Sequence, residues 1–155
     1  MSQQFHLLDQ QAPGLVAELC SLSVVQQRVI LVSVCRFMNT QFTDLDPAAR
    51  GLLREAAVKS ALSDDQVGQA HSLAERADTQ YLALQERSAP EAEWLYYFSQ
   101  ARLLSGLAIG FKCHDCTGIA DALYEFSGSL ANPSEMFALV RSSIKQLRNN
   151  ELPRG

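Results

Sequence analysis

Two cysteines spaced as C-x-x-C are the residues of this chain whose type and spacing most directly suggest chemistry. The motif is Cys113-His114-Asp115-Cys116, and it falls at an expected break between helices, just before or at the start of the next one. A helix N-terminus and the preceding Lys112 both favour the thiolate, which is the reactive form of cysteine in redox reactions. Cys113 and Cys116 are therefore the candidate catalytic residues if the protein is a thiol redox enzyme.

The motif resembles that of the all-helical alkylhydroperoxidase D-like family, in which a C-x-x-C also opens a helix. This resemblance implies a peroxidase or disulfide reductase activity carried by Cys113 and Cys116. The family has a histidine one helical turn after its second cysteine and a glutamate upstream of its first. Here those positions fall on Ala120 and near Ala101, so both proton carriers are replaced and any such enzyme would be a degenerate relative.

A zinc site is a second interpretation of the same motif. Cys113, Cys116 and His114 supply two or three ligands, whereas a closed structural site needs four. No second C-x-x-C or H-x₃-H pair is present, so the fold would have to bring in another cysteine or a residue such as His71. The sequence therefore predicts no metal.

Reduced thiols that carry no chemistry are the third interpretation. A chain of this size and apolar content does not need disulfides to hold a core, so we expect all four cysteines to be reduced. Cys20 and Cys35 should be buried and unpaired, because their spacing along one continuous helix would be about 22 Å. Alkylation of the folded protein should then reach Cys113 and Cys116 first.

No other pattern in the chain indicates catalysis. The three histidines, His6, His71 and His114, lie in unrelated settings. Nucleophile elbows, glycine-rich phosphate loops, H-E-x-x-H and E-x-x-H motifs are all missing from the sequence. We therefore predict no further catalytic residue and no cofactor.

A group of aromatic and acidic residues suggests a surface for a protein partner. Trp94, Tyr96, Tyr97 and Phe98 include three consecutive positions, which cannot all face one core, and tryptophan and tyrosine are enriched at interfaces. Acidic residues concentrate in the same half of the chain, although several of them also suit helix starts. Core packing and a solvated face remain open alternatives. The candidate binding residues are Tyr81, Glu86, Glu93, Trp94 and Tyr97.

The elements that must position these residues all have helical periodicity. We predict an all-α, compact single domain over residues 1–155, with a polar leader at 1–13 and a frayed tail at 150–155. About six helices are expected around a central apolar helix, and they cover residues 24–42, 47–62, 64–87, 89–111, 116–130 and 134–149, with a short turn or two over 15–22. The stretch 64–84 has a narrow alanine-rich seam, typical of an antiparallel helical hairpin. Gly106 and Gly110, four residues apart, predict close packing against a neighbouring helix.

Composition and charge limit the partners and the compartment. The chain has 155 residues, of which 47% are hydrophobic and 19% charged, and this fits one globular core. Its net charge is −4 and its basic residues are dispersed, so nucleic acid is not an expected partner. The apolar run at Val29–Val32 is far shorter than the roughly 20 residues that cross a bilayer, so no membrane association is expected. The first residues do not resemble a secretory signal, which predicts a cytoplasmic protein.

Two functions of different classes follow from these observations. The first is a non-catalytic protein-binding module that masks a partner, because a small acidic helical protein resembles, in architecture alone, bacterial immunity proteins and stoichiometric inhibitors. Its partner would be basic, such as a toxin or effector domain, and binding should weaken with salt and with charge reversal at Glu86 or Glu93. The alternative is the thiol redox enzyme that uses Cys113 and Cys116.

Overall fold

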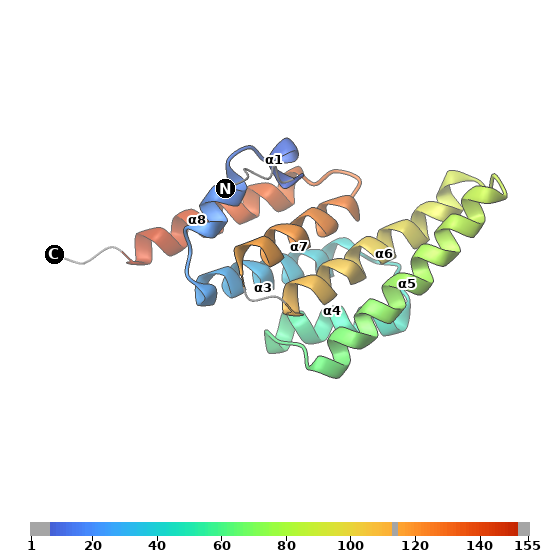
Figure 1. The fold of residues 1–155 in the computed structure, drawn as a ribbon, viewed down its shortest axis with the longest axis horizontal. Helices are drawn as coiled ribbons and strands as arrows, with labels where there is room; N and C mark the ends of the chain where they lie inside the picture. Colours follow the sequence, from blue (N-terminus) through green and yellow to red (C-terminus); the bar gives the residue numbers. More distant parts are fainter. Residues whose placement is uncertain (1–6, 113–114, 152–155) are drawn as a thin grey trace.

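The structure is a computed structural model, and it describes residues 7–112 and 115–151 of the chain. Its helices are α1 (Leu8–Gln11), α2 (Leu15–Cys20), α3 (Val24–Gln41), α4 (Pro47–Lys59), α5 (Asp64–Glu86), α6 (Glu91–Lys112), α7 (Cys116–Gly128) and α8 (Ser134–Glu151) (Figure 1). No residue within the two described ranges lies in a strand, which confirms the all-α class for them. The described residues form eight helices instead of about six, and the additional two are the short α1 and α2.

Local capping explains where the long helices begin. Ser23 and Ser63 each accept a hydrogen bond through the side-chain oxygen from the backbone N–H three residues later. The backbone N–H of each serine donates in turn to the side-chain oxygen of the glutamine at that position, so both form capping boxes. Asp46 caps α4 ahead of Pro47, whose ring presets the first turn. These starts depend on contacts three residues apart or fewer, which is why the sequence located them.

The predicted polar leader contributes to the core. Leu8 in α1 is fully buried and Ala12 is 3% exposed, although both lie within residues 1–13. Gly14, at φ 82°, provides the left-handed turn between α1 and α2, a backbone conformation that favours glycine. The tail prediction also needs correction at residue 150, which is helical in α8, whereas residues 1–6 and 152–155 lie outside the described chain.

The junction between α5 and α6 also differs from the prediction. The sequence predicts a helix from residue 89, but Ser88 just before it has a left-handed φ of 54°, and its N–H donates to the carbonyl oxygen of Gln85. Ser88 therefore ends α5, and α6 begins at Glu91 instead of Ala89.

The body of the molecule consists of α1–α4, α7, α8 and the second half of α6. α3 contacts α4, α7 and α8, while α6 contacts α4, α5 and α7, so these contacts do not single out α3 as the central helix. α6 packs closely on its neighbours at two glycines. A Cβ on Gly106 would lie 2.6 Å from a ring carbon of Phe126. One on Gly110 would lie 2.8 Å from a methyl carbon of Leu31, so the predicted close packing at both glycines is confirmed.

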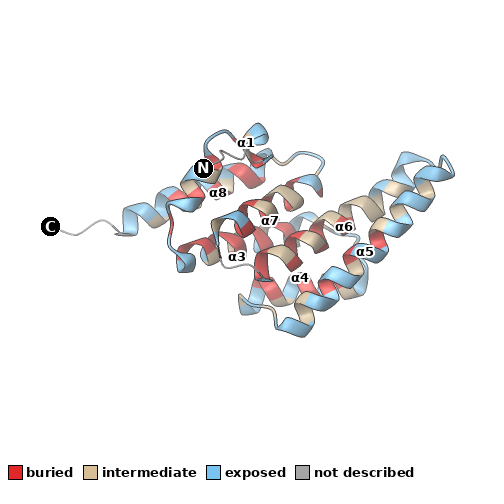
Figure 2. Ribbon diagram, in the orientation of Figure 1, coloured by how far each residue is buried: buried red, intermediate tan, exposed pale blue. Residues whose placement is uncertain are grey.

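The predicted antiparallel hairpin is formed by α5 and α6, and its far end, where α5 ends and α6 begins, projects from the body (Figure 1). The seam alanines Ala70, Ala74 and Ala77 are buried against α6. Beyond them no residue from Asp78 to Ser99 is buried, and the far end of the hairpin is mostly exposed or half-buried (Figure 2). The far end of the hairpin therefore exposes helix surface that the rest of the described chain does not cover.

Candidate functional site

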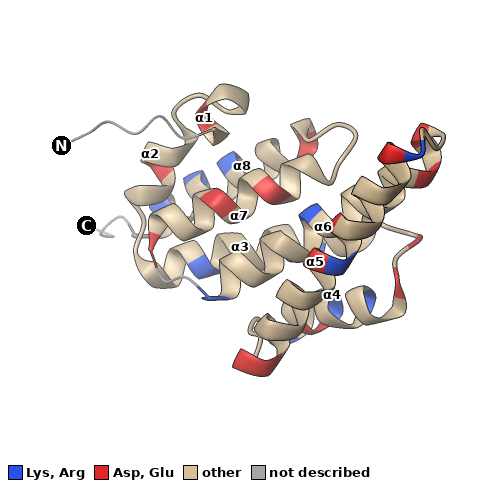
Figure 3. Cartoon of the chain, turned by 45° about the vertical axis from the view of Figure 1, so that its right-hand side comes forward, with Lys and Arg blue, Asp and Glu red and all other residues tan. Residues whose placement is uncertain are grey.

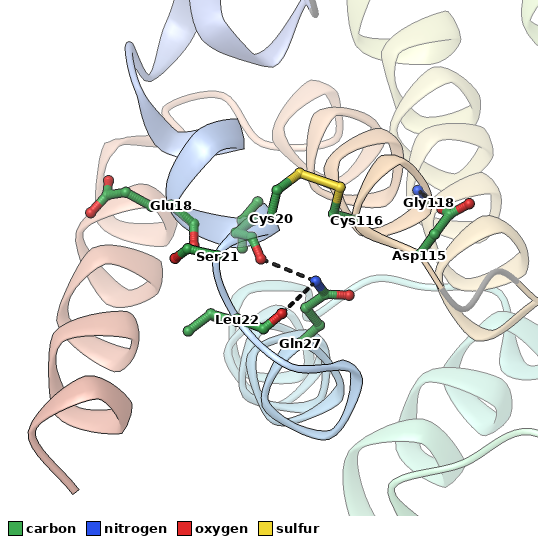
Figure 4. Close-up of a disulfide and its surroundings, with 9 residues drawn as sticks. Glu18, Cys20, Ser21, Leu22, Gln27, Asp115, Cys116 and Gly118 are labelled. Carbon is green, nitrogen blue, oxygen red and sulfur yellow. Dashed lines mark hydrogen bonds between the residues drawn. A yellow bond between two sulfur atoms is a disulfide. The ribbon is translucent and has the colours of Figure 1, made fainter. Parts of the chain in front are cut away.

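The structure pairs Cys116 with Cys20 in a disulfide (Figure 4). Their Cα atoms are 5.0 Å apart, within the usual range for a disulfide, although they are 96 residues apart in sequence. The bond joins the end of α2 to the start of α7, and the Gln27 side chain fixes the same end of α2 by donating to the carbonyl oxygens of Leu19 and Leu22, each at 3.1 Å. The expectations of reduced thiols and of a buried, unpaired Cys20 were therefore wrong.

Cys35 is the cysteine whose predicted state is confirmed. It is free and fully buried in α3, and desolvation by burial raises its pKa to about 12. A thiol with that pKa is protonated and unreactive at neutral pH. Its burial follows from its position on the apolar side of α3.

The redox and zinc interpretations of the C-x-x-C stay predictions. Cys113 and His114 lie outside the described residues, and Cys116 is bonded to Cys20. Within the described ranges no group of three or more histidine, cysteine or acidic side chains could hold a metal ion. His71 is exposed, and its Nε2 lies 3.5 Å from Oε1 of Glu75 on the same helix. Disulfides persist mainly in oxidising compartments, so the cytoplasmic location also stays a prediction.

Two of the predicted binding residues, Tyr81 and Trp94, meet at the far end of the hairpin. Their ring centroids are 5.6 Å apart, and Tyr81 also lies 5.1 Å from the ring of Phe98. All three side chains are half-buried, because each ring covers part of its neighbours. The rings therefore join α5 to α6 and offer a partner only their exposed edges.

An ion-pair cluster continues this stack toward the body. The Arg102 guanidinium lies 5.6 Å from the centre of the Phe98 ring, donates to both oxygens of Asp78 at 2.9 and 3.0 Å, and donates to Glu125 at 2.5 Å. Burial raises the pKa of Glu125, partly offset by the charge of Arg102, while Asp78 raises it further. The cluster ties α5, α6 and α7 together, and it fixes the antiparallel register of the hairpin.

A groove runs along the side of the hairpin opposite the Arg102 ion pairs. On α5 it is lined by Leu73, Ala77, Gln80 and Leu84. On α6 it is lined by Glu93, Tyr97, Gln100 and Leu104. Each set follows the spacing i, i+4, i+7, i+11, so each forms one stripe along its helix. In the antiparallel register Leu84 faces Glu93, Gln80 faces Tyr97, Ala77 faces Gln100, and Leu73 faces Leu104.

The loop between α3 and α4 forms the third wall of this groove, which we call the Tyr97 groove. Asp44 and Asp46 line it, and the backbone N–H of Asp46 donates to Gln100 Oε1 at 2.9 Å, which holds the loop against α6. Two hollows of about 450 and 240 Å³ share Tyr97 as a common wall. Beside them, burial and the nearby Asp44 raise the pKa of Tyr96. The groove therefore has a tyrosine at its middle and carboxylates along its rim.

The charge of the Tyr97 groove is mainly negative. Asp44, Asp46 and Glu93 line it, and Arg76 is the cation among its lining residues. Acidic residues also gather on the loop before α4 and at the far end of the hairpin (Figure 3). Of the predicted binding residues, Glu93 and Tyr97 line the groove, Tyr81 and Trp94 lie in the stack between the helices, and Glu86 is exposed near the end of α5.

Sequence reasoning missed several residues of the groove. The two matching stripes were detectable, because the spacing i, i+4, i+7, i+11 is present on both helices. The predicted seam of α5 includes Ala77 but not Leu73 or Gln80, so it did not predict the groove. Asp44 and Gln100 gave no local signal, since the path of the loop between α3 and α4 brings Asp44 to the groove and Asp46 to Gln100.

Comparison with known protein families, curated proteins and solved structures finds no match to this chain. Among the described residues, no helix combines the length and apolar character needed to cross a membrane.

Proposed function

We propose that this protein is a non-catalytic binding module that holds a basic segment of a partner protein in the Tyr97 groove. The observation that carries the proposal is the groove itself, where two registered helix stripes and three carboxylates surround a half-buried tyrosine. An aromatic side chain supplies buried contact area, and the surrounding carboxylates attract a cationic partner and speed its association.

The consequence for the partner is that one of its surfaces becomes covered. A stoichiometric inhibitor, such as an immunity protein that neutralises a toxin or effector domain, acts in this way without chemistry of its own. The stack of Trp94, Tyr81 and Phe98 and the Arg102 ion pairs support this role, because they stiffen the projecting hairpin and reduce the ordering cost of binding.

The experiment starts by capturing the partner from the source cell. A photo-crosslinking amino acid replaces Tyr97, and the crosslinked protein is identified by mass spectrometry and purified. Its affinity for this chain is then measured as a function of salt, and any activity of the partner is titrated with this chain. We expect affinity to fall as salt rises and the partner's activity to be lost at a 1:1 ratio.

Charge reversal at Glu93 provides the sharper test. Glu93→Lys should weaken binding about tenfold, because it places a like charge opposite a basic partner. Glu91→Lys is the matched control. Glu91 is also exposed in the first turn of α6, so its reversal has the same unfavourable interaction with the helix dipole. Because Glu91 lies two residues from Glu93 on the helix, its side chain points in another direction. Equal effects of the two reversals, or an affinity indifferent to salt, would contradict the proposal.

A further inference from the structure

We infer that the segment held by the Tyr97 groove is a single amphipathic helix with lysine or arginine beside its apolar stripe. This inference rests on the proposed function and adds to it the shape and chemistry of the bound element. It is carried by the geometry of α5 and α6, which together present the surface that a third helix of a bundle packs against.

The spacing of the groove residues matches helix packing. The α5 stripe from Leu73 to Leu84 and the α6 stripe from Glu93 to Leu104 each alternate steps of four and three residues, the spacing of helices that pack side by side. Each stripe spans twelve residues, and the eleven steps between its ends cover about 16 Å, or three helical turns. An extended strand would match neither this period nor the shape, because neither helix offers a backbone edge for strand pairing.

The structure also sets where such a helix can lie. α4 begins beside Gln100, where the N–H of Asp46 is bonded, and Ala48 of α4 lines the groove near Leu104. Leu104 and Gln100 are already buried there, at 2% and 5% exposed. Toward the far end, Gln80 and Glu93 are exposed and Leu84 is half-buried. The bound helix therefore covers the pairs Gln80–Tyr97 and Leu84–Glu93, and it ends where Ala77 and Gln100 are buried beside α4.

Charge decides between the possible occupants. A second copy of this chain would bring its own Asp44, Asp46 and Glu93 against the same carboxylates, because a two-fold contact opposes identical surfaces. Such a contact is repulsive, whereas lysine or arginine on a partner helix pairs with the same carboxylates. Arg76, lining the groove beside Ala77, adds a place for one acidic residue on that helix.

The test uses three synthetic peptides of about 18 residues, or five turns. The first has leucines at heptad a and d positions and lysines elsewhere, the second has glutamates in place of the lysines, and the third has the composition of the first in scrambled order. Affinity is measured by titration, and the contact surface is mapped by backbone amide chemical shifts. We expect only the first peptide to bind tightly, with shifts concentrated at residues 77–84 and 93–100.

A groove-filling variant and its control locate the binding. Gln80→Trp fills the groove from an exposed position on α5, so it should weaken the lysine peptide at least tenfold. Gln85→Trp makes the same change at an exposed position of α5 that does not line the groove, and it should leave affinity within twofold. The inference is overturned if the lysine peptide does not bind, if the scrambled peptide binds equally, or if the two variants behave alike. Sedimentation is measured in parallel, and a dimer that Gln80→Trp dissociates would assign the groove to self-association instead.

The natural partner separates this inference from the proposed function. If the crosslinked partner is sensitive to Glu93→Lys but not to Gln80→Trp, the helix inference fails while the protein-binding function stands. If neither variant changes its affinity, both fail. Sensitivity to both variants, with a helical contact segment in the crosslinked peptide, supports both.

Discussion

The two halves of α6 belong to different kinds of structure. In the second half, nine residues between Gln100 and Phe111 are buried, and glycines let neighbouring helices approach. In the first half, from Glu91 to Ser99, no residue is buried, and the helix contacts its hairpin partner α5 through aromatic rings. One continuous helix therefore anchors in the body and carries an uncovered surface outside it.

This difference shows how a small helical protein can keep a binding surface without weakening its core. In the body, small residues let neighbouring helices pack closely, and the Cys20–Cys116 disulfide links α2 to α7. In the hairpin, stacked rings and the Arg102 ion pairs hold the helices together. Contacts within the hairpin use only the faces that α5 and α6 turn toward each other. The Tyr97 groove lies beside these faces, and it includes the edge of the seam at Ala77.

Breaking the disulfide should have the largest effect on the body. Reduction, or Cys20→Ser, removes a link across 96 residues and should lower the free energy of unfolding by about 2–4 kcal/mol. Urea denaturation with and without reductant measures this loss. Cys20→Ser should not respond further to reductant, and equal stability of the oxidised and reduced wild type would contradict the pairing.

Alkylation followed by peptide mass spectrometry checks the same bond independently. Without reductant Cys20 and Cys116 should resist iodoacetamide, and mild reduction should expose them. Cys35 should react only after unfolding, because burial raises its pKa to about 12.

Substituting one glycine in each region should sharpen the comparison with a smaller effect. Gly106→Ala adds a methyl group where it would meet Phe126 at 2.6 Å, so it should cost about 1–3 kcal/mol despite the better helix propensity of alanine. Gly68→Ala lies on the exposed side of α5 with open space around it, and should stabilise by about 0.5–1 kcal/mol. Thermal and urea denaturation of both variants test this, and a stabilised Gly106→Ala would show that α6 and α7 pack less closely.

A substitution at the junction between hairpin and body should give the smallest effect, and this effect should appear in the pH dependence of stability. Burial raises the pKa of Glu125 above its ordinary value of 4.5, so the folded state holds this proton more tightly than the unfolded state. The stabilisation from this group is then complete below the unfolded pKa and is lost as pH rises through the folded pKa. Glu125→Gln, which stays neutral, should gain stability relative to the wild type as pH rises from 4 to 7. Parallel pH profiles from urea denaturation would contradict this.

Helix positions were predictable because their signals are local. Ser23 with Gln26 and Ser63 with Gln66 complete their hydrogen bonds within four residues, and the alanine seam of α5 depends only on helix periodicity. The start of α6 was predicted two residues too early. Ser88 is followed three residues later by a glutamate, and this pattern suits a helix start as well as a chain reversal that ends the previous helix. The local pattern is the same in both cases, and only the backbone path distinguishes them.

The sequence by itself determined the all-helical class, the starts of the long helices and the presence of an aromatic, acidic hairpin. The tertiary structure alone decided that Cys116 pairs with Cys20, and that the N–H of Asp46 bonds to Gln100 beside Tyr97. The physical reason is the distance along the chain over which each interaction closes. Capping and periodicity act within one or two turns, whereas these contacts join segments brought together only when the body packs, and no residue type announces its partner across that separation.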